Sequence, residues 1–213
     1  MRIDSVFDMG EESFVEVHED LFGFTSGYRY KFITVNGIMY QTKAISLDIC
    51  KKACLEFLKK HSVCFTGHRT LRSNISSLYQ DILAEIDFFY EMGYRFFFCG
   101  GAVGFDMLAA EAVLKYKEQH SDVILVMAVP FKNQDNKYIQ ADKQRYAALL
   151  KDADFHIMFS ESYYDRCYLD RNDFMLKHSN ALIAYWDGKT VGGTSYTFRK
   201  AVSVKSFVIH NLY

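Results

Sequence analysis

The chain has 213 residues, of which 50% are hydrophobic and 16% aromatic, and its formal net charge is −1. This composition supports one substantial domain with a well-filled core plus an appendage, and it excludes an intrinsically disordered chain. The near-zero net charge also excludes a global attraction to nucleic acid or to anionic membranes, although it leaves open a local groove for single-stranded nucleic acid.

The first 62 residues predict a small N-terminal unit. Residues 1–20 hold seven acidic side chains against one arginine, which favours a solvated acidic arm, while Val15 and Val17 alternate with charge and leave a short edge strand open. Two β-rich runs flank Asn36-Gly37, the pair typical of a type I′ hairpin turn. Apolar residues at helical spacing then predict a helix over 48–60. We expect this unit to have a packing role rather than to contact nucleic acid or a partner subunit.

From residue 63 onward, short apolar runs alternate regularly with helical patterns. The expected strands span 63–67, 96–99, 123–130, 155–158, 181–186 and 206–210, and the expected helices span 75–92, 105–116, 138–150, 170–178 and 195–202. This alternation predicts an α/β domain over 63–213, with a doubly wound, mostly parallel sheet and helices on both faces. Ligands of such sheets bind beyond the carboxyl ends of the strands, near the point where the strand order reverses.

The loops that follow the expected strands hold glycines, hydroxyl groups and cations. In chain order, their candidate ligand-binding residues are Thr66, Gly67, His68, Arg69, Gly100, Gly101, Ala102, Gly104, Asp106, Pro130, Asp187, Gly192, Gly193, Thr194 and Ser195. Two of these loops place a glycine pair directly before a helix, where unpaired N–H groups and the positive end of the helix dipole attract phosphate. Arg69 can pair with an anion through two hydrogen bonds, and His68 can stack on a base. Close strand–helix packing is the alternative explanation for each glycine pair.

Several other chemistries lack their sequence motifs. The dinucleotide motif G-x-G-x-x-G, the Walker motif G-x-x-x-x-G-K-[ST] and the nucleophile motif G-x-S-x-G do not occur, so hydride transfer and ATP hydrolysis are disfavoured. The five cysteines form no C-x-x-C pair, so we expect core thiols and no disulfide framework, metal site or cofactor. No stretch has the roughly 18 apolar residues of a membrane span and no apolar leader opens the chain, so we expect a cytoplasmic protein with no membrane partner.

The segments CFTGHR, GGAVGFDMLAAE, DRND and DGKTVGGTSYT occur in this order. Together they resemble the YpsA-type branch of the SLOG superfamily over about residues 63–210. They are also similar to DNA-processing protein A and, more distantly, to the LOG-type, lysine-decarboxylase-like phosphoribohydrolases. The resemblance implies a Rossmann-like fold and a pocket for nucleotides or nucleotide-derived ligands such as ADP-ribose derivatives, and it adds Arg171 and Asn172 to the expected pocket. The hydrolase relatives carry a glutamate that supports N-glycosidic cleavage, and Thr197 stands at the corresponding position here.

Three functions are compatible with this sequence. The favoured one is binding, for sensing or sequestration, of a phosphate-bearing, nucleotide-derived small molecule. The first alternative is an enzyme that acts at the N-glycosidic bond with Asp106, Glu111 or Asp187 as its carboxylate. Thr197 argues against this enzyme, because a hydroxyl group stabilises an oxocarbenium-like charge poorly. The second alternative is binding of single-stranded DNA on the basic and aromatic stretch 163–171, for which we favour instead a lid over the pocket or a partner surface. We also expect self-association as a dimer.

Overall fold

The computed structural model describes residues 1–17, 27–71 and 74–213. Within them, seven strands form one large sheet in the order β1-β8-β7-β6-β5-β9-β10, and every neighbouring pair is parallel. The strands are β1 (Arg2–Ile3), β5 (Ser62–Gly67), β6 (Phe96–Cys99), β7 (Ile124–Val129), β8 (Phe155–Met158), β9 (Ala181–Tyr185) and β10 (Val208–Asn211). From β5 the chain builds outward through β8 and then crosses back to β9, so the strand order reverses at β5. The expected doubly wound, Rossmann-like α/β fold is confirmed.

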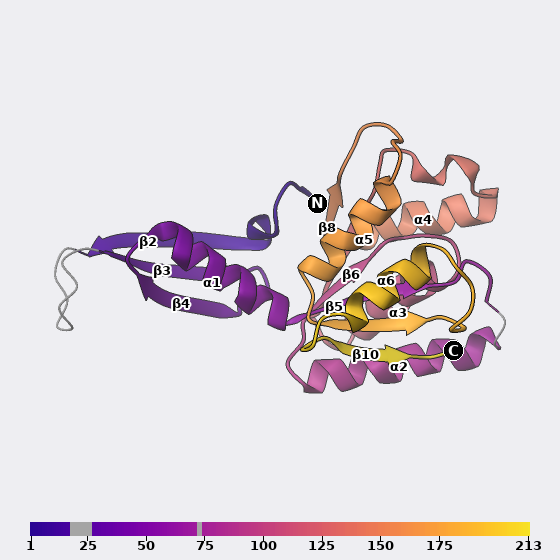
Figure 1. Cartoon of the computed structure of the whole chain (residues 1–213), viewed down its shortest axis with the longest axis horizontal. Helices are drawn as coiled ribbons and strands as arrows, with labels where there is room; N and C mark the ends of the chain where they lie inside the picture. The colour runs from indigo at the N-terminus through magenta and orange to yellow at the C-terminus, as the bar shows by residue number, and fades with distance from the viewer. Residues whose placement is uncertain (18–26, 72–73) are drawn as a thin grey trace.

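Helices cover both faces of the large sheet (Figure 1). They are α2 (Ile75–Glu91), α3 (Phe105–Lys117) and α4 (Gln140–Asp152) on one face, and α5 (Cys167–Lys177) and α6 (Gly193–Val202) on the other. The side chains of each strand alternate between the two faces: Val63 and Phe65 of β5 belong to one apolar cluster, and Cys64 to the other. Of the helices in the described ranges, none combines the length and apolar character needed to cross a membrane.

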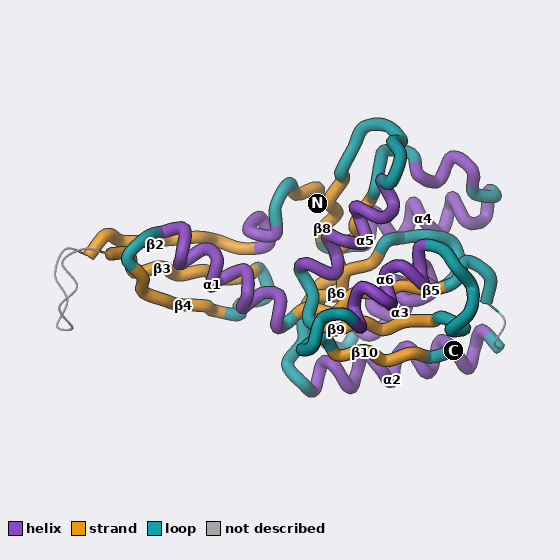
Figure 2. The backbone as a smooth tube through the Cα atoms, viewed as in Figure 1, coloured by secondary structure: helices purple, strands orange, loops and turns teal. Residues whose placement is uncertain are grey.

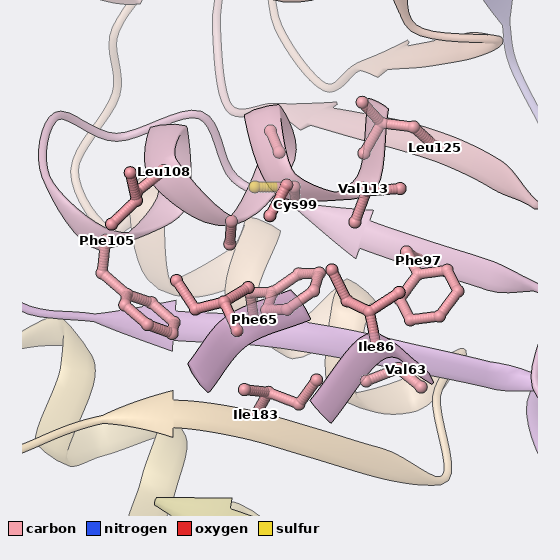
Figure 3. Packing of buried hydrophobic residues seen from close by; sticks show 14 of the residues in the cluster. Val63, Phe65, Ile86, Phe97, Cys99, Phe105, Leu108, Val113, Leu125 and Ile183 are labelled. Atoms are coloured by element: carbon pink, nitrogen blue, oxygen red, sulfur yellow. The ribbon is translucent and has the colours of Figure 1, made fainter. Parts of the chain in front are cut away.

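Figure 3 shows the apolar core on the α2 and α3 side of the large sheet. Phe65, Phe97 and Ile183 come from the neighbouring strands β5, β6 and β9, and they pack with Ile86 of α2 and Val113 of α3. All these side chains are fully buried, and apolar burial contributes about 25 cal/mol per Å². All five cysteines are buried and unpaired, as expected of core thiols. The core therefore fixes the strand ends from which the functional loops leave.

The N-terminal unit is a three-stranded antiparallel sheet covered by one helix. Its elements are η1 (Val6–Met9), β2 (Gly10–Val17), β3 (Gly27–Thr34), β4 (Met39–Ala44) and α1 (Leu47–Lys60). The strand β2 corrects the expectation of a solvated acidic arm, and β1 corrects it again by extending the large sheet beside β8. The Tyr30 hydroxyl donates to Glu12 over 2.9 Å, and Lys51 pairs with the same carboxylate at 3.0 Å. The acidic strand is thus held by partners on β3 and α1.

The hairpin between β3 and β4 turns at Asn36 and Gly37, as expected, but its turn is not of type I′. That turn requires a positive φ at both central residues. Of the two, only Gly37 has one, at +83°. The Gly37 amide donates to the carbonyl of Thr34 over 2.9 Å, so Gly37 closes a longer loop in which it takes the left-handed position.

The N-terminal unit lies at the amino ends of the large-sheet strands. Helix α1 leads through His61 into the start of β5. Figures 1 and 2 show the small sheet projecting away from the end toward which β10 points. The side-chain amide of Asn36 donates to the carbonyl of Asp122 over 2.6 Å and so connects the hairpin turn to the segment before β7. The apolar cluster is also continuous, from Tyr30 and Phe32 of the small sheet to the strands of the large one. The described part of this unit therefore leaves the carboxyl edge of the large sheet free.

Candidate functional site

A cavity of about 430 Å³ lies at the carboxyl edge of the large sheet, where the strand order reverses. Small-molecule sites commonly occupy roughly 300–1,000 Å³. The cavity is lined by Thr66, Gly67, His68, Arg69, Ala102, Asp106, Tyr168, Leu169, Arg171, Asn172, Thr190, Val191, Gly192, Gly193 and Thr194. The structure thus brings together residues from the loop after β5, the starts of α3 and α5, and the loop between β9 and α6. We call this space the phosphate cavity.

The start of α6 forms one wall of the phosphate cavity. The helix begins at Gly193, and the amides of Gly193 and Thr194 have no hydrogen-bond acceptor within the described part of the chain. A Cβ atom on Gly192 would meet nothing within 4 Å, and one on Gly193 would meet a single atom at 3.8 Å. The Ser195 hydroxyl accepts the Gly192 amide over 2.9 Å, and the Thr194 hydroxyl donates to the carbonyl of Gly67 over 2.8 Å. These bonds hold the turn and leave two amides open at the positive end of the helix dipole.

Arg69 and His68 form the rim on the β5 side. Arg69 is exposed, and its guanidinium group lies 5.8 Å from the centre of the Tyr168 ring, in a cation–π contact. His68 is oriented by the loop after β9, because its Nε2 accepts the backbone N–H of Asp187 at 3.1 Å. A guanidinium group in this position can pair with an anion in the cavity through two hydrogen bonds.

Asp187 stabilises its own loop and lies outside the phosphate cavity. Its carboxylate accepts the Thr190 hydroxyl over 2.5 Å, the Thr190 amide over 2.7 Å and the Lys189 amide over 3.0 Å. These bonds, the Thr190 hydroxyl above all, hold the pKa of Asp187 well below its usual range. The carboxylate therefore stays ionised near neutral pH and has no proton to donate. It lines a neighbouring cavity of about 330 Å³ with His68 and Arg69, and the catalytic role of Asp187 stays a prediction.

The glycines before α3 are surrounded by the protein's own groups. Gly100, Gly101 and Gly104 are absent from the described lining of the phosphate cavity, and the expectation that they contact a ligand stays a prediction. A Cβ atom on Gly100 would lie 2.0 Å from Nη1 of Arg171. One on Gly101 would lie 2.8 Å from the side chains behind it, and one on Gly104 would lie 2.3 Å from the carbonyl oxygen of Arg69. Gly101 and Gly104 also have positive φ angles of +66° and +93°. Internal packing is sufficient to explain why glycine occupies these three positions.

Asp106 occupies the start of α3, where a ligand anion was expected. Its side chain is buried, and its Oδ2 accepts the Ala102 amide over 3.4 Å. Burial raises the pKa of Asp106 above its ordinary value, and the positive charge of Arg171 opposes this shift without cancelling it. Asp106 is the only carboxyl group among the described residues that line the phosphate cavity. The pair of carboxylates typical of glycosidases is therefore not assembled there.

A buried chain of hydrogen bonds joins the loop before α3 to the start of α6 through two side chains of α5. Arg171 donates from Nη1 to the carbonyl of Gly100 and from Nε to Oδ1 of Asn172, the latter over 2.7 Å. Asn172 donates to the Thr197 hydroxyl over 2.8 Å, and that hydroxyl donates to the carbonyl of Gly193 over 2.8 Å. Thr197, which the resemblance places opposite the hydrolase glutamate, is fully buried and has a structural role here. Arg171 and Asn172 both line the phosphate cavity and hold its frame.

Besides Asp187 and the three glycines before α3, three further predicted residues lie outside the described lining of the phosphate cavity. Glu111 accepts two hydrogen bonds of 2.8 and 3.0 Å from Arg145, so it joins α3 to α4, and its catalytic role stays a prediction. Pro130 is buried directly after β7 and is absent from the described lining. Ser195 caps α6 and lines a neighbouring groove instead.

Four residues line the phosphate cavity without having been predicted as ligand-binding residues. Tyr168 and Leu169 belong to the first turn of α5, whereas the sequence pattern predicted that helix only from residue 170. Thr190 could have been found, because an aspartate followed three residues later by threonine is typical of a side-chain-capped turn. Val191 carries no sequence signal for a site, and it is 81% exposed at the mouth of the cavity.

The loops that build the cavity fall within the segment 63–211, which matches the family model YpsA, described as the YspA SLOG family. The chain belongs to the YpsA family of SLOG proteins. This confirms the family suggested by the sequence motifs. Most of the N-terminal unit, including β2, β3, β4 and α1, lies before the matched segment.

Curated relatives of this YpsA-family chain are moderately similar to it. UPF0398 protein BH1768 of Halalkalibacterium halodurans is 29% identical over 132 residues, which cover 61% of this chain and 68% of that protein. UPF0398 protein YpsA of Bacillus subtilis is 24% identical over 110 residues, which cover 51% and 61%. The SPbeta prophage-derived protein YoqJ of Bacillus subtilis is 32% identical over 114 residues, which cover 48% and 66%. An X-ray structure of TM1055 is 16% identical, with a TM-score of 0.43 and coverage of 67% of this chain and 68% of that one.

Proposed function

We propose that this protein binds a phosphate-bearing, nucleotide-derived small molecule, such as an ADP-ribose derivative, in the phosphate cavity. The open start of α6 carries this proposal, because the amides of Gly193 and Thr194 lack internal acceptors in the described chain and both residues line the cavity. A phosphate group there accepts hydrogen bonds from these amides and interacts favourably with the helix dipole. Arg69 lines the same cavity and supplies a guanidinium group for the remaining phosphate oxygens.

The surroundings support a binding site more than a catalytic centre. The Arg171–Asn172–Thr197 chain fixes the cavity wall through buried hydrogen bonds. The Tyr168 ring near Arg69 offers an aromatic surface to the ligand. Cleavage of an N-glycosidic bond by the two-carboxylate mechanism needs a second carboxylate besides Asp106, and the described lining supplies none. We therefore propose sensing or sequestration of the ligand without its cleavage.

The variant Gly193→Leu tests this proposal. Its Cβ atom has room, since the nearest atom, Nδ2 of the cavity-lining Asn172, would lie at 3.8 Å, and we expect the rest of the leucine side chain to block the open amides. We expect isothermal titration calorimetry with ADP-ribose to show binding to the wild-type chain and at least about a 100-fold loss in the variant, since each charge-assisted hydrogen bond contributes about 1.5–3 kcal/mol. The melting temperature should change little.

The control is Ser77→Leu, which adds the same side chain to an exposed first-turn position of α2 and should leave binding unchanged. Equal ADP-ribose affinity for Gly193→Leu and wild type would rule out the phosphate cavity as the site. Incubation of wild-type protein with ADP-ribose, followed by chromatography for a released base or ribose, distinguishes binding from the enzymatic alternative. A filter assay with a labelled oligonucleotide at two salt concentrations tests the DNA-binding alternative.

A further inference from the structure

A second and larger space adjoins the phosphate cavity. This space, here called the side groove, measures about 690 Å³ and is lined by Leu169, Val191, Gly192, Gly193, Ser195, Tyr196, Arg199 and Lys200. Four of these residues, from Leu169 to Gly193, also line the phosphate cavity. The two spaces therefore meet at the start of α6, and a single molecule can occupy both.

The Tyr196 ring forms a wall of the side groove that is fixed in advance. The Tyr196 hydroxyl donates to Oδ2 of Asp173 on α5 over 3.0 Å and accepts from Nζ of Lys200 over 3.3 Å. Lys200 also pairs with Asp173 at 2.8 Å, so the three groups hold one another. Because these contacts fix the ring orientation, stacking of a ligand on the ring costs little side-chain ordering.

The rest of the side groove is apolar or cationic. Leu169 and Val191 contribute aliphatic surface, and Val191 is 81% exposed between the two spaces. The guanidinium group of Arg199 lies 5.7 Å from the centre of the Trp186 ring, and the Trp186 indole N–H donates to the carbonyl of Thr190 over 2.9 Å. No carboxylate occurs among the described residues that line the groove. Such a surface suits a flat, aromatic part of an otherwise anionic molecule.

We infer that the side groove binds the base of the same nucleotide whose phosphate lies in the phosphate cavity, with the base against Tyr196. This inference rests on the proposed function and narrows it, since it assigns an intact nucleotide rather than a sugar phosphate or inorganic phosphate. A base and its 5′-phosphate are joined through one ribose, so they require adjoining spaces. The two spaces here adjoin through Val191, Gly192 and Gly193.

The test compares AMP with ribose 5-phosphate, which carries the same phosphate and sugar but no base. We expect calorimetry to give wild-type protein at least about tenfold tighter binding of AMP, because stacking contributes about 1–3 kcal/mol per base. Tyr196→Leu should weaken AMP binding about tenfold and leave ribose 5-phosphate binding unchanged. Tyr196→Phe keeps the ring and should retain the AMP affinity, which controls for the loss of the hydroxyl contacts to Asp173 and Lys200.

Trp186 offers a second measurement that needs no variant. It is the single tryptophan of the chain, and Arg199 on the groove wall lies over its ring. AMP should change the tryptophan fluorescence of the wild-type chain, and ribose 5-phosphate should not. This readout covers the case in which Tyr196→Leu fails to fold.

The possible outcomes bear differently on the base site and on the proposed function. Equal wild-type affinities for AMP and ribose 5-phosphate would overturn the base site while leaving phosphate binding intact. If Tyr196→Leu weakened the binding of AMP and of ribose 5-phosphate equally, Tyr196 would be shown to stabilise α6 rather than to contact the base. If Tyr196→Leu changed the mass of the protein in solution, measured by light scattering, while AMP binding stayed unaltered, the groove would be assigned to contact with a second copy of the chain. Failure of both ligands to bind the wild type would overturn the inference, and failure of ADP-ribose to bind as well would overturn the proposed function.

Discussion

Gly100 and Gly192 both precede a helix, yet the spaces that their missing Cβ atoms leave have different surroundings. The space beside Gly100 holds Nη1 of Arg171, a side chain that is itself buried and bonded to the carbonyl of Gly100. The space beside Gly192 contains no protein atom within 4 Å, and its backbone is extended, with a φ of 160°. The first glycine is therefore required by the fold, and the second leaves room for a ligand.

Alanine substitution at these two positions should separate the two roles. Gly100→Ala places a methyl group 2.0 Å from Arg171, so the guanidinium group must move and its buried hydrogen bonds weaken. We expect a loss of about 1–3 kcal/mol or more in the free energy of unfolding, measured by urea denaturation. Gly192→Ala should stay within about 0.5 kcal/mol of the wild type. Comparable stability losses in both variants would contradict this assignment.

At the scale of the elements, the sequence predicted most helices and strands, because each shows its buried face as a regular pattern of apolar residues. The apolar runs of the large sheet are buried on both faces, and α2 repeats its apolar residues at helical spacing. Strand β2 was not favoured, since six of its seven residues from Glu11 to Val17 are exposed and three are glutamates. It depends on backbone pairing with β3 and on Lys51, which is distant in sequence.

The candidate site was predictable in part for the same reason. Parallel topology alone brings the loops after β5 and β9 to one edge, and this placed Arg69 near Gly192 and Gly193. What fills the space beside a glycine depends on residues far away in the chain. Arg171, which lies beside Gly100, is 71 residues distant from it, and no local pattern encodes that contact.

Asp106 is a buried acidic group at the start of α3, so the free energy of unfolding should depend on pH. Burial raises the pKa of Asp106, so the folded state disfavours its ionised form. The stability that Asp106 contributes is present below the ordinary carboxyl pKa of about 3.9 and is lost as the pH rises toward the raised value. We expect Asp106→Asn to match wild-type stability near pH 3.5 and to exceed it increasingly toward pH 7, in urea denaturation at several pH values.

Asp81→Asn is the control, since Asp81 is an exposed carboxylate on α2. A pH-independent difference for Asp106→Asn would show that the Asp106 carboxyl titrates normally in the folded chain. A difference that grows in favour of the wild type at higher pH would show instead that the charge of Arg171 dominates over burial.

At the scale of the whole molecule, the N-terminal unit and the large sheet share one apolar cluster and so should unfold together. Asn36 tests this coupling, since its amide donates to the carbonyl of Asp122, 86 residues away, over 2.6 Å. Asn36→Asp keeps an oxygen for the Thr34 hydroxyl and removes the donor. We expect a loss of about 1–2 kcal/mol and a single transition by both circular dichroism and tryptophan fluorescence. The control Gln41→Glu makes the same chemical change at an exposed position of β4 and should have little effect. Two separate transitions in Asn36→Asp would show that the small sheet folds independently of the cavity-bearing domain.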